Sequence, residues 1–317
     1  MPNIPLRKLG QTSIEISALG LGAWQFSGGR GLIGGYWEAL DEATTRAIVE
    51  AAVAGGINWF DTAEAYGGGE SERNLSRALR QAGIGSDQVR IATKWWPVLR
   101  TADHLRATID ERLDCLGGYP IAHYIVHQPL SLSSIHRQMN TMADLMDEGR
   151  IESVGISNFT ARGMRQCHEV LSRRGYGLAA HQVRYSMLFR KIESNGVLDA
   201  ARELGTTIIA WSPLEQGLLT GRFHELGKVP DSVSWMRRGM IGNRLEKTRP
   251  LIDRMRELGE KYQATVSQIA LNYLIHAQGD TVVAIPGASR VSQVEQNVGA
   301  LRFRLEPEDI EELTALC

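Results

Sequence analysis

Strand-like runs that alternate with longer stretches of helical periodicity occupy almost all of the 317 residues, and this alternation constrains the fold most strongly. We predict eight strands, at Ser17–Trp24, Asn58–Glu64, Val89–Trp95, Ile121–Gln128, Glu152–Phe159, Leu178–Ser186, Thr206–Pro213 and Thr281–Ala288. Such alternation is typical of parallel βαβ units, which build an open doubly wound sheet or a closed (β/α)8 barrel. The count of eight and the lack of a glycine fingerprint after the first strand favour the (β/α)8 TIM barrel.

Helices are expected between these strands, where apolar residues recur at helical spacing. They are predicted over Thr44–Ala54, His104–Leu116, Leu132–Glu148, Ala161–Arg174, Gly196–Leu204 and Leu251–Ala277. Asp41 and Thr101 are candidate N-caps, and Gly117 and Gly205 are candidate helix stops.

Two segments lie outside the alternation. Leu6–Ser17 is typical of an N-terminal β-hairpin, and Leu214–Thr248 is a long connection after the seventh strand, of the kind that usually serves function. Because no linker or charge block divides the chain, we expect residues 1–317 to form one barrel domain.

Composition excludes several kinds of partner. Lysine and arginine (35) balance aspartate and glutamate (36), so overall charge attracts neither nucleic acid nor an anionic membrane. The three cysteines are scattered, which argues against a disulfide framework or a zinc site. With no secretory signal or spanning segment in view, a cytoplasmic location is expected. Charge and length leave the oligomeric state open between a monomer and a homo-oligomer.

Polar residues collect at the predicted strand ends, which is where barrel enzymes place their chemistry. Such groups occur at the ends of six successive strands, from the second to the seventh. They also occur at the start of the segment that follows the eighth strand. They are Asp61 with nearby Tyr66, Lys94, His127, Ser157-Asn158, Gln182 with Tyr185, Trp211-Ser212, and Ser289-Arg290. So many polar strand ends meeting at one mouth predict a functional site there.

The residues Asp61, Tyr66, Lys94 and His127 suit a carbonyl that accepts a hydride. A carboxylate would hold the lysine protonated, and the ammonium would lower the pKa of the tyrosine from about 10 toward neutral pH. A phenol tuned in this way is a general acid, and a neutral histidine can donate a second hydrogen bond to the same oxygen.

At these residues the sequence resembles the aldo-keto reductase superfamily, from Leu6 to Leu313. The stretch Gly56–Gly67, with Asp61 and Tyr66, is similar to the first family signature, and Lys94 and His127 close their strands as in the family. The resemblance implies Tyr66 as acid/base, Lys94 and Asp61 as its tuning pair, and His127 as the group that orients the carbonyl. It is nearest to the bacterial branch and to the potassium-channel beta subunits.

The resemblance also implies where a nicotinamide cofactor binds. Ser157, Asn158 and Gln182 match residues that hold the nicotinamide amide, and Trp211 matches the residue on which the ring stacks. The other implied cofactor positions are Trp24, Ser212, Pro213, Leu214, Gly217, Arg222, Gly287, Ser289, Arg290, Gln293, Gln296 and Asn297. Because a hydroxyl and a guanidinium are good donors to a phosphate, Ser289 and Arg290 favour NADPH over NADH.

Several alternatives stay open or are set aside. His123 and His127 on one strand would lie roughly 13 Å apart, so no metal site is predicted. Tryptophans that could line a substrate pocket are Trp24, Trp37, Trp95, Trp96 and Trp235, with Trp24 and Trp95 favoured. A regulatory subunit that binds NADPH with little turnover, or an aldolase or isomerase that uses Lys94 through a Schiff base, remains possible. The expected partner is a small-molecule carbonyl compound.

Overall fold

A computed structural model describes residues 4–29, 38–231, 233 and 235–317. Eight parallel strands form one sheet in the order β10-β9-β8-β7-β6-β5-β4-β3. Their bounds are β3 Leu21–Gly22, β4 Trp59–Asp61, β5 Arg90–Trp95, β6 Ile121–Val126, β7 Val154–Ser157, β8 Ala180–Arg184, β9 Thr207–Trp211 and β10 Val282–Ala284. The sheet closes on itself through bridges between Leu19 and Ala284 and between Gly22 and Gly287. The predicted (β/α)8 barrel is confirmed.

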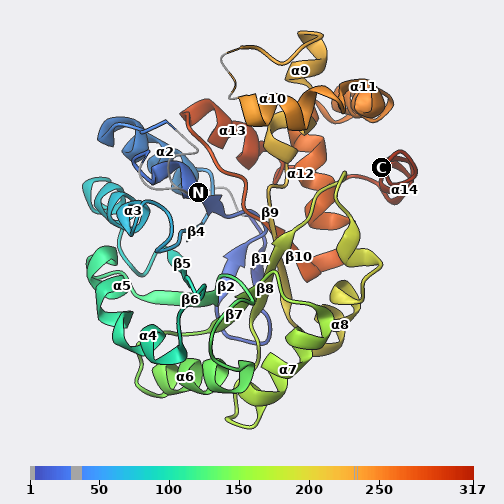
Figure 1. Ribbon diagram of the computed structural model, residues 1–317. Coiled ribbons are helices and arrows are strands. Elements are labelled where there is room, and N and C mark those ends of the chain that lie inside the picture. The colour runs from blue at the N-terminus through green and yellow to red at the C-terminus, as the bar shows by residue number, and fades with distance from the viewer. Residues whose placement is uncertain (1–3, 30–37, 232, 234) are drawn as a thin grey trace.

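Helices cover the outside of the barrel, as Figure 1 shows. Those that follow strands β3 to β8 are α2 Glu42–Ala54, α3 Glu70–Gln81, α4 Ala102–Ala107, α5 Ile109–Leu116, α6 Ile135–Asp147, α7 Ala161–Ser172 and α8 Val197–Leu204. Two 3-10 turns also occur: η1 Trp24–Phe26 follows β3, and η2 Lys191–Glu193 follows β8. Asp41 caps α2 by accepting from Thr44 N–H, as predicted, whereas Thr101 precedes α4 without a side-chain cap.

The segment after β9 is not an irregular loop. It contains η3 Glu215–Thr220, α9 Arg222–Glu225 and α10 Trp235–Gly242, and it leads into α11 Leu245–Tyr262. The chain then continues through α12 Val266–His276, η4 Gly279–Thr281, β10, α13 Val291–Gly299 and α14 Pro307–Ala315. In Figure 1, α9, α10 and α11 gather above the barrel, next to α13.

Two predicted helices are each divided in the structure. The stretch Leu251–Ala277 breaks after α11 because Gln263 is left-handed (φ 51°) and Thr265 begins α12 with a capping box to Gln268. The stretch His104–Leu116 breaks at Thr108, whose hydroxyl donates to the carbonyl of His104 and ends α4.

The predicted hairpin is present and closes the amino-terminal end of the barrel. Strands β1 Leu6–Lys8 and β2 Glu15–Ser17 pair in antiparallel register, and Gly10 N–H donates to the hydroxyl of Thr207 at the start of β9. Side chains from the hairpin pack on Trp59 at the start of β4, whose indole donates to the Ser17 carbonyl. The hairpin therefore covers this end of the barrel.

In the described part of the chain, no helix is both long and apolar enough to cross a bilayer.

Candidate active site

A cavity of about 1230 Å³ opens at the carboxyl ends of the strands. The sequence nominated twenty residues for catalysis or cofactor binding, and nineteen of them line this cavity. The other, Lys94, is fully buried directly behind it. The cavity runs from the centre of the barrel, at Asp61 and His127, outward to α12 and α13. The structure therefore brings the nominated residues together in one place.

Lys94 is the centre of the buried polar group at the inner end of the cavity. Its ammonium donates to Asp61 Oδ1 (2.6 Å), to the carbonyl of Thr62 (2.7 Å) and to the hydroxyl of Tyr66 (3.3 Å). Asp61 also accepts from Gln182 Nε2 at 2.7 Å. All three protons of the ammonium are therefore used, and Lys94 is held in a single position.

The electrostatics keep Lys94 charged. Burial opposes its positive charge, but Asp61 and Tyr66 outweigh this effect and raise the pKa of Lys94 above its usual value. A lysine held in this way is a fixed positive charge beside the tyrosine hydroxyl.

The pKa of Tyr66 is raised, not lowered as the sequence predicted. Burial is the largest cause, and it outweighs the opposing charge of Lys94, while Asp61 raises the pKa further. Tyr66 is therefore a protonated phenol at neutral pH. Because its oxygen accepts from Lys94, the hydroxyl proton is left for an acceptor in the cavity.

His127 is neutral in this site. Burial, and secondly the charge of Lys94, hold the pKa of His127 well below its usual value. Its ring lies edge-on to Tyr66 (centroids 5.8 Å apart) and to Trp96 (5.2 Å). Its Nδ1 is buried without a hydrogen-bond partner among the described residues. His127 can therefore hydrogen-bond to an uncharged oxygen but brings no charge of its own.

At the end of β9 the backbone takes up left-handed conformations that only a well-held loop maintains. Ser212 (φ 54°), Glu215 (φ 46°) and Gln216 (φ 58°) are all non-glycine residues. Glu215 is buried, and its carboxylate accepts from Arg184 on β8 (2.8 Å) and from Arg244 before α11 (2.8 Å). This residue, which the sequence analysis did not single out, ties the loop to the barrel and to α11.

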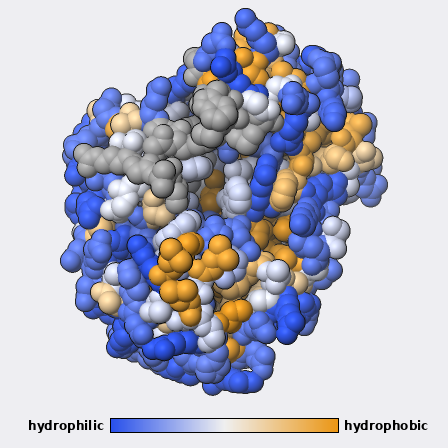
Figure 2. Space-filling model, viewed as in Figure 1, coloured by the Kyte–Doolittle hydropathy of each residue, from blue (hydrophilic) through white to orange (hydrophobic). Residues whose placement is uncertain are grey.

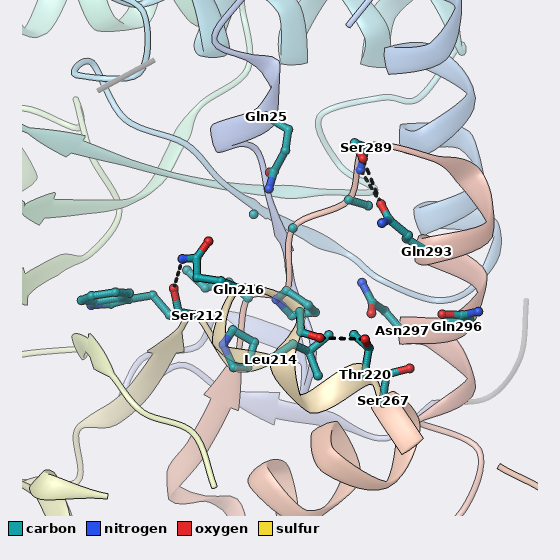
Figure 3. A pocket seen from close by; sticks show the side chains of 18 of the residues that line it. Gln25, Ser212, Leu214, Gln216, Thr220, Ser267, Ser289, Gln293, Gln296 and Asn297 are labelled. Carbon is teal, nitrogen blue, oxygen red and sulfur yellow. Dashed lines mark hydrogen bonds between the residues drawn. The ribbon is translucent and has the colours of Figure 1, made fainter. Parts of the chain in front are cut away.

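Figure 3 shows the outer part of the cavity, where side chains of α13 face those of η3. Ser289 donates through its backbone N–H to Gln293 Oε1 (2.8 Å), and Asn297 Nδ2 is buried without a partner among the described residues. Gln25 approaches Gly287 closely, since a Cβ on that glycine would lie 2.4 Å from the amide nitrogen of Gln25. The glycine therefore allows the Gln25 side chain to pack directly against the backbone of this wall.

Two aromatic residues that the sequence placed at the mouth point away from it. Trp95 is fully buried and its indole donates to His104, so the preference for Trp95 was wrong and Trp96 lines the cavity instead. Tyr185 is also buried, and its hydroxyl donates to Glu193. The reason is that side chains alternate between the two faces of a strand. Lys94 faces inward, so its neighbour Trp95 faces outward. Gln182 also faces inward, so Tyr185, three residues later, faces outward.

Trp24 lines the cavity as predicted and stacks near Tyr66 (centroids 5.9 Å apart). Trp37 lies outside the described residues, and the side chain of Trp235 is likewise not described.

Comparison with known proteins agrees with this site. The sequence profile of the Aldo/keto reductase family matches residues 18–317, and the chain belongs to that family. A probable aldo-keto reductase 1 of Glycine max is 29% identical over 96% of this chain and 87% of that protein. An uncharacterized oxidoreductase of Mycobacterium bovis is 35% identical over 95% of this chain and 89% of that protein. Family and fold thus define the class of this protein. It is an oxidoreductase that reduces carbonyl groups with a nicotinamide cofactor.

Solved structures have the same fold. A thermostable aldo-keto reductase in complex with the inhibitor epalrestat has a TM-score of 0.77 at 26% identity, covering 99% of this chain and all of that one. The glycerol dehydrogenase of Gluconobacter oxydans has a TM-score of 0.85 at 24% identity, covering 100% of this chain and 95% of that one.

Proposed function

We propose that this protein reduces aldehydes or ketones to alcohols with NADPH, and that Tyr66 is the general acid. The observation that carries the proposal is the hydrogen bond from the Lys94 ammonium to the Tyr66 hydroxyl at 3.3 Å, with Asp61 behind the lysine at 2.6 Å. It joins a protonated phenol that faces the cavity to a buried cation that stabilises the phenolate left after proton donation.

The residues along the cavity suit a dinucleotide with phosphate groups. Arg222 and Arg290 both line it and bring two guanidinium groups to its wall. The unpartnered Asn297 amide suits an adenine base, and Trp211, whose indole is held by Asn158 at 3.2 Å, offers a flat face to a nicotinamide ring. With Ser289 beside Arg290 at the mouth of the cavity, a 2′-phosphate has two donors. When bound, the cofactor supplies the hydride.

The protein residues then have distinct parts in the reaction. Neutral His127 and the phenol of Tyr66 both donate a hydrogen bond to the carbonyl oxygen, which polarises the carbonyl and orients it. As negative charge develops on that oxygen, Tyr66 transfers its proton there and becomes a phenolate. Lys94 stabilises this phenolate, and Asp61 holds the ammonium in place. The phenolate later regains a proton from water through the open mouth of the cavity.

Two other functions fit less well. A Schiff-base enzyme needs a neutral lysine that reaches its substrate, but Lys94 is buried behind the cavity and its pKa is raised. A regulatory subunit with little turnover would not require the complete set of Asp61, Tyr66, Lys94 and His127 around one oxygen site.

The test is the variant Tyr66→Phe. The matched control is a separate variant, Tyr176→Phe, at a half-buried tyrosine outside the cavity. Because only the acid is removed, we expect the turnover number for aldehydes to fall by about 100-fold or more, while NADPH still binds. Consumption of NADPH measures turnover, and quenching of tryptophan fluorescence measures binding. Activity near that of the unmodified protein in Tyr66→Phe would refute the assignment.

A further inference from the structure

An exposed apolar surface borders the mouth of the cavity. Of the six large hydrophobic side chains that are exposed in the described part of the chain, three lie on the loops that follow β5 and β6. They are Leu99 (80% exposed), Leu130 (64%) and Leu132 (68%), which we call the leucine platform. Figure 2 shows hydrophobic side chains gathered on the face turned to the viewer, between hydrophilic surroundings. Exposed leucines lower the solubility of a protein. A group of them at the entrance to a site therefore indicates that the surface binds something.

The two loops are joined into one unit. Val98 and Ser131 form an antiparallel bridge, and Leu132 N–H donates to the carbonyl of Arg100 at 3.0 Å. The Ser131 hydroxyl donates to the same carbonyl at 2.9 Å. The leucines are therefore presented by ordered backbone.

A buried carboxylate fixes the first loop from below. Glu64 accepts from Trp96 N–H at 2.8 Å and from the guanidinium of Arg100. Glu64 and Arg100 therefore form an ion pair beneath the loop that carries Leu99.

Leu99 has a left-handed backbone with φ 58°. Leu99 is the third residue of a turn that the Arg100 N–H closes onto the carbonyl of Pro97 (2.9 Å), a position at which some turn types require a positive φ. The turn directs the leucine side chain outward, away from the core of the barrel.

The two loops that carry the platform also reach the cavity, although none of the three leucines lines it. The loop that carries Leu99 also carries Trp96, which lines the cavity and contacts His127, and the loop that carries Leu130 begins at His127 itself. A carbonyl group held by Tyr66 and His127 leaves the rest of its molecule to extend past Trp96 and over these loops.

We propose that the leucine platform binds the distal apolar part of the carbonyl substrate, so that the preferred substrates are aldehydes or ketones with an extended alkyl or aryl body. This inference rests on the proposed carbonyl reduction. It assigns Leu99, Leu130 and Leu132 to substrate selection, in addition to the groups that carry out the chemistry.

The test compares propanal, hexanal and decanal in the unmodified protein and in the triple variant Leu99→Ser/Leu130→Ser/Leu132→Ser. The matched control is Leu6→Ser, an exposed leucine on the hairpin at the opposite end of the barrel. In the unmodified protein, kcat/KM is expected to rise with chain length. In the triple variant, the advantage of decanal over propanal should shrink by about tenfold or more, since the apolar surface that the longer chain covers is lost. A chain of the same length that ends in a carboxylate should lack the advantage in both proteins.

The outcomes separate this inference from the proposed function. If no aldehyde is turned over with NADPH or NADH, the proposed function itself fails. If aldehydes are reduced but kcat/KM is independent of length, or the triple variant keeps the same length dependence, the platform does not bind substrate. If light scattering shows a dimer that the triple variant loses, a second copy of the chain occupies the platform and the inference is overturned.

Discussion

Lys94 and Asp61 form a completely buried ion pair at 2.6 Å in the centre of the barrel, with the lysine side chain 0% and the aspartate side chain 2% exposed. The two residues come from adjacent strands, β5 and β4. A buried pair stabilises little compared with apolar residues of the same size, but removing one partner leaves an uncompensated charge. The pair therefore makes both stability and chemistry sensitive to a single substitution.

Lys94→Met should destabilise the protein strongly, because Asp61 then stays buried without its counter-charge. We expect a loss of about 3–5 kcal/mol in the free energy of unfolding, measured by urea denaturation. Lys191→Met, at an exposed lysine, is the control and should be neutral. A Lys94→Met protein as stable as the unmodified one would show that the pair is uncharged in the folded state.

Arg290→Ala should change cofactor preference. The guanidinium lines the cavity beside Ser289, so its loss removes a charge-assisted hydrogen bond to a 2′-phosphate. We expect KM for NADPH to rise by about tenfold or more, from about 1.5–3 kcal/mol per such bond, with little change for NADH. Arg302→Ala, at an exposed arginine after α13, is the control. Equal changes in KM for NADPH and NADH would show that Arg290 does not bind the 2′-phosphate.

His123 should make folding stability depend on pH. Burial, and secondly Lys94, lower the pKa of His123 to about 3, so the unfolded chain takes up a proton below the ordinary value of 6.5 while the folded protein does not. Above pH 6.5 the neutral His123 leaves the free energy of unfolding unchanged. As the pH falls from 6.5 toward 3, proton uptake by the unfolded chain lowers the free energy of unfolding. At about pH 5 the loss from this one residue is about 2 kcal/mol.

His123→Leu removes this titration, and the Ser153 hydroxyl retains its bond to the carbonyl of Ala122. Urea midpoints at neutral pH and at about pH 5 measure the effect. The difference between the two conditions should shrink by about 2 kcal/mol in the variant. An unchanged difference would mean that His123 is already protonated in the folded barrel, or that it is not the group responsible.

Much of the fold could be predicted from the sequence, because its signals are local. The strand runs, the N-cap Asp41 and the hairpin each depend on residues close in the chain. Helix α3 was missed because few apolar residues, among them Leu75 and Leu79, mark its buried face. The break between α11 and α12 could have been found, since Thr265 and Gln268 have the spacing of a capping box.

The sequence by itself determined which residue types meet at the mouth of the barrel, since the carboxyl ends of parallel strands converge wherever the strands are found. Only the tertiary structure decided which neighbour faces the cavity, Trp96 and not Trp95, because this depends on where each strand ends. It alone decided the direction of the Tyr66 pKa, since desolvation depends on how much protein surrounds a group. It also brought the loops of Leu99 and Leu132 together, through a backbone pairing that no local pattern shows.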